Sequence, residues 1–239
     1  TNLVEQVNKA PAPGQLIQVI EPVLSQLSID QALFTQAKDF SGDILYARRP
    51  AGGFSGQGFL NTLFGSLAAY EIKYGASTPE EIFRLYLSDF LKYDTDYLPL
   101  SGAAKTELWR LLKAADYKSA DFLDLYLQNS LLARLRSASD FTEVRKVILE
   151  NADALGISLT AYNKKTVYQQ DLVMQAVYAK RDTIQTIKYI KISFEDAINE
   201  VDSSSSGGQG GGPSGNRTNN NTTEVAFDPV APSPSPSPQ

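Results

Sequence analysis

The sequence contains no cysteine and no histidine among its 239 residues. Without cysteine the chain has no disulfide framework, no thiolate nucleophile and no cysteine-built metal centre. Without histidine it lacks Ser-His-Asp and Cys-His catalysis and imidazole metal ligands. Catalysis by a pair of carboxylates stays open, because it needs neither residue. Nothing in the sequence alone, however, shows that two carboxylates come together in the fold. We therefore expect a protein that is not an enzyme and that holds no cofactor or metal ion.

Basic side chains are fewer than acidic ones, with 22 Lys and Arg against 27 Asp and Glu and a net charge of −5. A field of this sign does not recruit nucleic acid. One local basic cluster is interleaved with acids, which is typical of a solvated helix face rather than of a one-sided basic surface. It comprises Arg134, Arg136, Arg145 and Lys146. We therefore expect neither DNA nor RNA as a partner.

No N-terminal run of basic and then apolar residues resembles a signal peptide, and the lack of cysteine fits any compartment. Residues 50–70 carry no charge and have the length of a membrane span, but they include five glycines, Gln57 and Asn61. We expect a soluble protein without a transmembrane helix. A weaker alternative is binding to a membrane surface through residues 52–70.

Apolar residues recur at helical spacing over most of residues 1–202. This pattern predicts an all-α body, an irregular bundle of about seven or eight helices, built as one domain or as two tightly associated halves. Residues 41–58 interrupt the pattern, and residues 44–46 within them also fit a short strand. Residues 160–201 contain no Gly or Pro and are predicted to be helical, although residues 183–194 partly alternate as a strand does.

The composition changes after Asp202. Of residues 203–239, 24 of 37 are Ser, Gly, Pro or Asn, and Phe227 is the only aromatic residue. Such a segment cannot bury enough apolar surface to offset its conformational entropy, so we predict a disordered tail. Within it, Val225, Phe227 and Val230 could dock a tethered peptide into a partner's groove or onto a sheet edge. The alternative is a spacer with a few chance apolar residues.

A glycine-rich loop is the local pattern that most resembles a working site. Glycines let backbone amides approach a ligand, two arginines can clamp a phosphate or carboxylate, and an aromatic ring can stack. The helix predicted to start near residue 59 would point its positive end at the same place. The spacing matches neither the dinucleotide fingerprint nor the phosphate loop, and contact with a partner is an alternative. The residues are Arg48, Arg49, Gly52, Gly53, Phe54, Gly56 and Gly58.

These observations favour contact over catalysis. The chain has 12 tyrosines, all before Asp202, and tyrosines that lie outside the core supply contact area at interfaces. Our main hypothesis is a non-enzymatic structural or assembly protein that packs against other protein subunits as a homo- or hetero-oligomer, through its helical body, loop and tail. The alternative is a binding protein or an enzyme that takes a small ligand or phosphate at the Arg48–Arg49 loop.

Overall fold

The computed structural model describes residues 2–76, 78–82 and 97–206, and every regular element within these ranges is helical. The predicted all-α class is confirmed. The same ranges hold eleven α-helices, more than the seven or eight expected, and two 3-10 helices, η1 (Glu21–Leu27) and η3 (Arg181–Thr183). The α-helices are α1 (Leu3–Lys9), α2 (Pro13–Ile20), α3 (Gln31–Arg48), α4 (Gly56–Tyr74), α5 (Pro79–Ile82), α7 (Gly102–Ala114), α8 (Phe122–Arg136), α9 (Phe141–Glu150), α10 (Thr160–Asn163), α11 (Val167–Lys180) and α12 (Ile187–Ser206).

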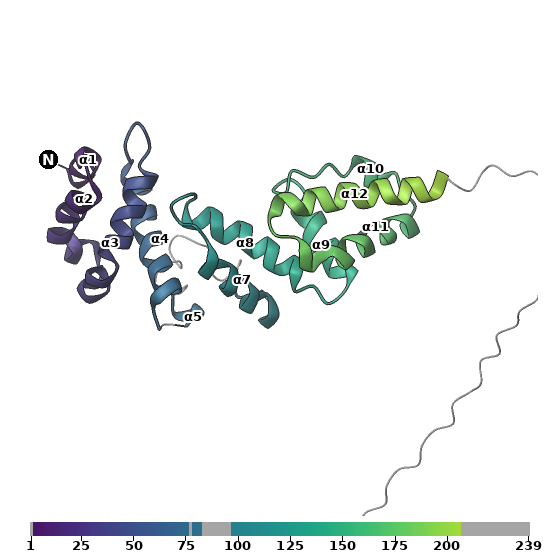
Figure 1. Ribbon diagram of the computed structural model, residues 1–239, viewed down its shortest axis with the longest axis horizontal. Helices are drawn as coiled ribbons and strands as arrows, with labels where there is room; N and C mark the ends of the chain where they lie inside the picture. Colours follow the sequence, from purple (N-terminus) through teal and green to yellow (C-terminus); the bar gives the residue numbers. More distant parts are fainter. Residues whose placement is uncertain (1, 77, 83–96, 207–239) are drawn as a thin grey trace, which may run out of the picture.

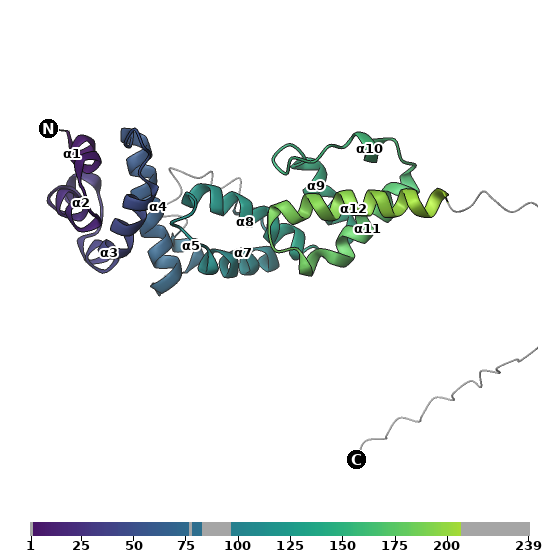
Figure 2. The same cartoon turned by 45° about the horizontal axis from the view of Figure 1, so that its top comes forward.

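The helices follow one another in a row, so the described body is elongated (Figure 1). α1, α2 and α3 lie at one end, α4, α5, α7 and α8 occupy the middle, and α9 to α12 lie at the other end (Figures 1 and 2). The buried apolar side chains form three clusters in the same order along the chain, which we name the N-terminal, central and C-terminal cores.

The N-terminal core lies between α1, α2, η1, α3 and the first half of α4. The side chains of Asn2 and Asp30 cap α1 and α3, each accepting a hydrogen bond from a backbone N–H of the first turn. α2 and α3 pack closely at Gly42, where a Cβ atom would lie 2.9 Å from Cγ1 of Ile17. The largest fully buried side chains here are Phe34, Phe59, Leu16, Ile20, Leu45, Leu63 and Leu67.

Two long helices each contribute to two cores. α4 places Leu63 in the N-terminal core and Ile72 in the central core, and both are fully buried. α8 places Tyr126 in the central core and Leu135 in the C-terminal core. Each of these helices therefore buries side chains on more than one side, and neighbouring cores share a helix.

α3 is longer than the sequence predicted. The helix expected to end near residue 40 continues to Arg48, so the short strand considered for residues 44–46 was wrong. Of the irregular stretch predicted for residues 41–58, only residues 49–55 lie outside a helix. Ser41, Ile44 and Leu45 are buried at helical spacing and continue the face that the helix turns toward the core. The glycine at position 42 misled the prediction, because it serves helix packing rather than a turn.

Residues 160–201 are helical, as predicted, but they form three helices rather than one. α11 begins with a capping box between Thr166 and Gln169, and η3 separates it from α12. Ile190 and Phe194, within the stretch that partly alternates, are four residues apart and fully buried on one face of α12. α12 continues past Asp202 to its end at residue 206. Residues 207–239, with Val225, Phe227 and Val230, lie outside the described residues.

Candidate functional site

The predicted glycine-rich loop is a short connection, residues 49–55, between the end of α3 and the start of α4. Gly56 and Gly58 belong to the first turn of α4. Ser55 caps this helix, because its Oγ accepts a hydrogen bond from the N–H of Gly58 at 3.0 Å. A Cβ atom at Gly52 or Gly56 would meet nothing within 4 Å, so these two positions face open space.

Arg49 fastens the loop to the end of α1. Its Nη1 donates to the carbonyl oxygens of Val7 and Asn8, both at 3.1 Å, and of Ala10 at 2.7 Å. A cation near the last carbonyls of a helix also interacts favourably with the negative end of the helix dipole. The guanidinium further lies 5.0 Å from the centre of the Tyr46 ring. The Arg49 side chain therefore joins α1 to the end of α3.

A second link joins the loop to α1. The Asn8 carboxamide pairs with the main chain of Phe54, whose N–H donates to Oδ1 at 2.7 Å and whose carbonyl accepts from Nδ2 at 3.0 Å. Gly53 has φ +82°, and a Cβ atom there would lie 2.7 Å from Cγ of Asn8. Phe54 is 7% exposed and packs edge-on against Phe59, so its ring belongs to the N-terminal core rather than to a ligand platform.

Arg48 points toward the central core. Its Nη2 lies 2.8 Å from Oδ2 of Asp121 and its Nε donates to Oδ1 at 3.2 Å, while Nη1 donates to the carbonyl of Ser119 at 3.2 Å. This two-pronged ion pair connects the end of α3 to the start of α8. The cavity beside it, at about 10 Å³, has room for at most one water molecule.

The structure therefore brings the predicted loop residues close to one another, with both arginines already engaged. A bound anion would have to compete with the Asp121 carboxylate for Arg48 and with three carbonyls for Arg49. Binding of a small ligand or phosphate at this loop stays a prediction.

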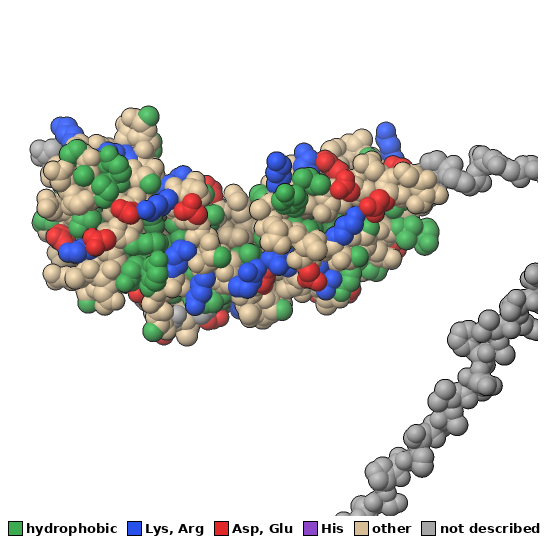
Figure 3. Space-filling model, viewed as in Figure 1, with side chains coloured by type: hydrophobic (Ala, Val, Ile, Leu, Met, Phe, Trp, Pro, Cys, Tyr) green, Lys and Arg blue, Asp and Glu red, His purple; other side chains and the backbone are tan. Residues whose placement is uncertain are grey.

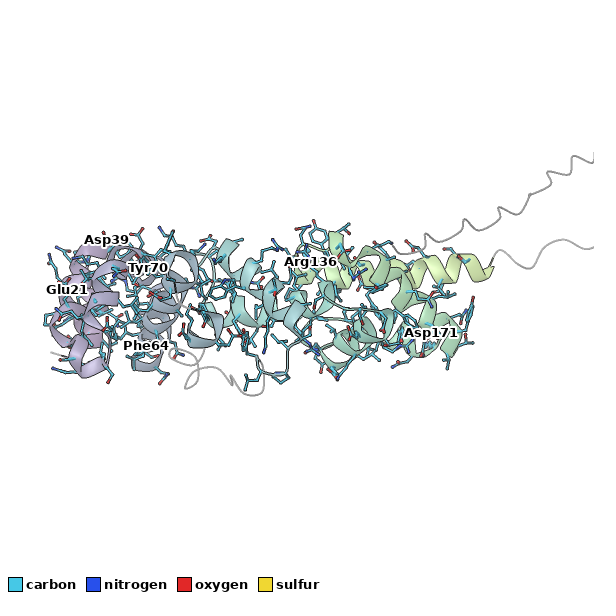
Figure 4. All side chains as sticks on the ribbon, turned by 90° about the horizontal axis from the view of Figure 1, so that it is seen from below. Glu21, Asp39, Phe64, Tyr70, Arg136 and Asp171 are labelled. Atoms are coloured by element: carbon cyan, nitrogen blue, oxygen red, sulfur yellow. The ribbon has the colours of Figure 1, made fainter. Side chains whose placement is uncertain are left out.

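Ionisable side chains of the C-terminal half pair with one another. Oε1 of Glu107 lies 2.7 Å from Arg110 and 3.0 Å from Arg136. The hydrogen bond from Arg110, together with the charges of both arginines, lowers the pKa of the Glu107 carboxyl. Arg136 lies near the middle of the body and Asp171 near its C-terminal end (Figure 4).

Within the described ranges, no cluster of three or more acidic side chains could hold a metal ion. The basic cluster is paired in the same way, Arg134 with Glu150 and Arg145 with Asp171.

No helix in the described part of the chain is long and apolar enough to cross a membrane. In the segment 52–70, which we considered for a membrane surface, Phe59, Leu63 and Leu67 are at most 1% exposed. Surface binding through these side chains would require α4 to leave the N-terminal core.

The described tyrosines divide into core and surface positions. The hydroxyl of Tyr117, inside the central core, donates to the carbonyl of Leu112 at 2.7 Å, and burial raises its pKa. The other buried tyrosines are Tyr97, Tyr126 and Tyr162, while Tyr46, Tyr74, Tyr168 and Tyr189 are exposed. Only part of the tyrosine set is therefore free to contact a partner.

The sequence did not indicate a groove that lies between α1 and the α2–η1 segment. Its volume is about 810 Å³, within the range of small-ligand and peptide sites. Leu3, Val19 and Val23 line it and are half-buried, and among the described residues that line it Lys9 alone is charged. Four exposed glutamines also line it: Gln6, Gln15, Gln18 and Gln26. Their recurrence along α1, α2 and η1 was the available sequence signal.

At the opposite end of the body, two adjacent apolar side chains are largely exposed. Val167 is 75% exposed and Tyr168 is 71% exposed, the highest values among the large apolar residues of the described ranges. Both lie in the first turn of α11. Figure 3 shows hydrophobic side chains gathered at this end, below the place where α12 ends.

A row of leucines on α8 forms a further exposed surface. Leu123 and Leu127 are four residues apart on one helix face and are 40% and 43% exposed. Beside them lies a hollow of about 490 Å³, lined in part by Pro99, Leu100 and Leu127.

No family model, curated protein or solved structure matches this chain.

Proposed function

We propose that the protein is a non-enzymatic structural subunit that packs into a larger complex, as a homo- or hetero-oligomer. The exposed pair Val167 and Tyr168 is the observation that carries this proposal. The capping box of Thr166 and Gln169 already stabilises the start of α11, so neither side chain is needed there for the fold. Burying each of them against a partner would contribute about 1.5–3 kcal/mol.

The leucine row on α8 supports the same role. Leu131, one turn beyond Leu127, is half-buried, so the exposed row ends where α8 enters the C-terminal part of the body. Apolar and aromatic side chains that share one face are the usual centre of an interface. In this proposal the loop and the tail add contacts at its edge.

The test is the mass of the full chain in solution over a range of concentrations, measured by sedimentation and mass photometry. We expect the unchanged chain to associate, and the double substitution Val167→Ser with Tyr168→Ser to weaken association at least about tenfold, since about 1.4 kcal/mol corresponds to a factor of ten. Tyr189→Ser is the matched control, because it removes a tyrosine that is 52% exposed elsewhere on the surface.

A strict monomer, found both for the purified chain and in native extract, would rule out the proposal. Equal weakening by Tyr189→Ser and by the double substitution would remove the Val167–Tyr168 pair as its basis.

A further inference from the structure

We propose that the groove between α1 and the α2–η1 segment binds residues 224–232 of a second copy and thereby links copies head to tail. This inference rests on the proposed role as an assembly subunit and names the contact. The groove and the point where the chain leaves the described residues lie at opposite ends of the body (Figure 1).

The groove has the chemistry of a peptide site. Its half-buried apolar side chains, including Leu3, Val19 and Val23, offer surface for two or three apolar groups. Its four exposed glutamine side chains each carry both hydrogen-bond donors and an acceptor. A carboxamide of this kind can pair with both the N–H and the carbonyl of one residue in an extended chain, as Asn8 does with Phe54 in the same part of the fold.

The sequence 224–232 suits such a groove. Pro229 and Pro232 disfavour a helix and favour an extended backbone for the residues before them. In an extended chain Val225 and Phe227 project to the same side, because the side-chain period is two. Val230 adds a third apolar group. The backbone groups between these side chains would then face the glutamines.

The charges also match. Lys9 is the single charged residue in the described lining of the groove, and its side chain is 70% exposed in an ion pair with Glu5 one helical turn away. Exposed pairs of this kind contribute little, so Lys9 can exchange Glu5 for another carboxylate. Glu224 and Asp228 flank the apolar residues of the segment and carry the complementary charge.

Distance favours a second copy over the same one. α12, with its 20 residues, spans about 30 Å at about 1.5 Å per residue, and the helices of the middle of the body lie between it and the groove (Figures 1 and 2). The layers of α4, α3 and α2 add about 10 Å each. The 18 residues between Ser206 and Val225 reach at most about 60 Å when fully extended. A Gly- and Ser-rich chain of that length has a root-mean-square span of only about 23 Å.

A contact between two different surfaces is heterologous, so copies joined in this way form an open chain or, where the rotation between them closes, a ring. The natural absence of cysteine allows a direct test with the full chain. One variant carries Phe227→Cys and another carries Val23→Cys. We expect the mixed pair to form a disulfide-linked dimer under mild oxidation, read as a doubled mass without reductant.

The matched control is Thr35→Cys, which places a thiol on the exposed face of α3. Phe227→Cys should cross-link with Val23→Cys at least about tenfold faster than with Thr35→Cys, because binding raises the effective concentration of the two thiols. In addition, Lys9→Glu should slow the cross-link, and Asp228→Lys combined with it should restore the rate.

Equal rates with Thr35→Cys, or no cross-link with Val23→Cys, would overturn the inference. So would a chain carrying both Phe227→Cys and Val23→Cys that closes on itself at high dilution. These results are separable from the proposed function: if the copies still associate by mass while the cross-link fails, assembly stands and the groove contact falls. A strictly monomeric unchanged chain overturns both.

Discussion

The carboxamide of Asn8 and the main chain of Phe54 form a closed pair of hydrogen bonds across 46 residues of sequence, at 2.7 and 3.0 Å. This pair, with Arg49, fixes α1 on the loop between α3 and α4. The end of the chain that carries the groove is therefore held by these polar contacts together with the packing of Val7 in the N-terminal core.

Replacing Asn8 tests this link. Asn8→Ala removes both hydrogen bonds and leaves a half-buried N–H without its partner, so we expect the free energy of unfolding to fall by about 2–3 kcal/mol. Urea denaturation followed by circular dichroism measures the change. Asn61→Ala, an exposed asparagine on α4 that bonds Gln57, should change stability by less than about 0.5 kcal/mol. Equal effects of the two substitutions would contradict the link.

Two neighbouring glycines should respond differently to alanine. Gly53 has φ +82° and its Cβ would overlap the Asn8 side chain, whereas a Cβ at Gly52 would meet nothing within 4 Å. We expect Gly53→Ala to destabilise the protein by about 1–3 kcal/mol and Gly52→Ala to leave it unchanged or slightly more stable, by up to about 1 kcal/mol. Thermal melting of the two variants side by side checks the order, and a reversed order would show that the loop adopts another conformation.

The two arginines should differ in the same way. Arg49 donates to three carbonyls, so Arg49→Ala should destabilise the protein by about 2–4 kcal/mol. In the Arg48–Asp121 pair the Asp121 side chain is 46% exposed, so Arg48→Ala should change stability by about 1 kcal/mol or less. Denaturation and phosphate titration on the same samples separate a structural role from a ligand role. Unchanged stability with lost phosphate binding would favour the ligand hypothesis.

The ion pairs of Glu107 predict a pH dependence. Its pKa is lowered in the folded protein, chiefly by the hydrogen bond from Arg110. A lowered folded-state pKa means that the unfolded chain binds the proton more readily, so the stabilisation is complete above about pH 5 and is lost as the pH falls through the folded-state pKa. Compared with Glu107→Gln, the unchanged protein should be more stable near neutral pH, and the difference should shrink as the pH falls below about 5. If the difference in the free energy of unfolding between the two proteins does not change with pH, the ion pairs of Glu107 are not the source of the pH dependence.

The helical class could be read from the sequence because it depends on local spacing. Ile190 and Phe194 define one face of α12 whatever surrounds them. The roles of the arginines could not be read, since the partner of Arg48 lies 73 residues away and those of Arg49 about 40 residues away. Nothing local distinguishes an arginine that binds a ligand from one that holds two helices together.

The exposure of Val167 and Tyr168 could not be predicted from the sequence for a related reason. Val167 fits the apolar pattern of α11, and only the position of α12 and α9 against that helix shows which apolar side chains face outward. Gly42 was misread in the opposite sense, because its close approach to Ile17 becomes evident only once α2 packs on α3.

The sharing of α4 and α8 between neighbouring cores has a consequence for how the protein melts. Removing α4 strips buried side chains from both the N-terminal and central cores, and removing α8 does the same to the central and C-terminal cores. A row of three separate clusters would open one at a time from its ends. Because one continuous helix runs through each boundary between neighbouring cores, we expect the described body to unfold in one cooperative transition. A destabilising substitution at one end should therefore lower the melting temperature of the whole body.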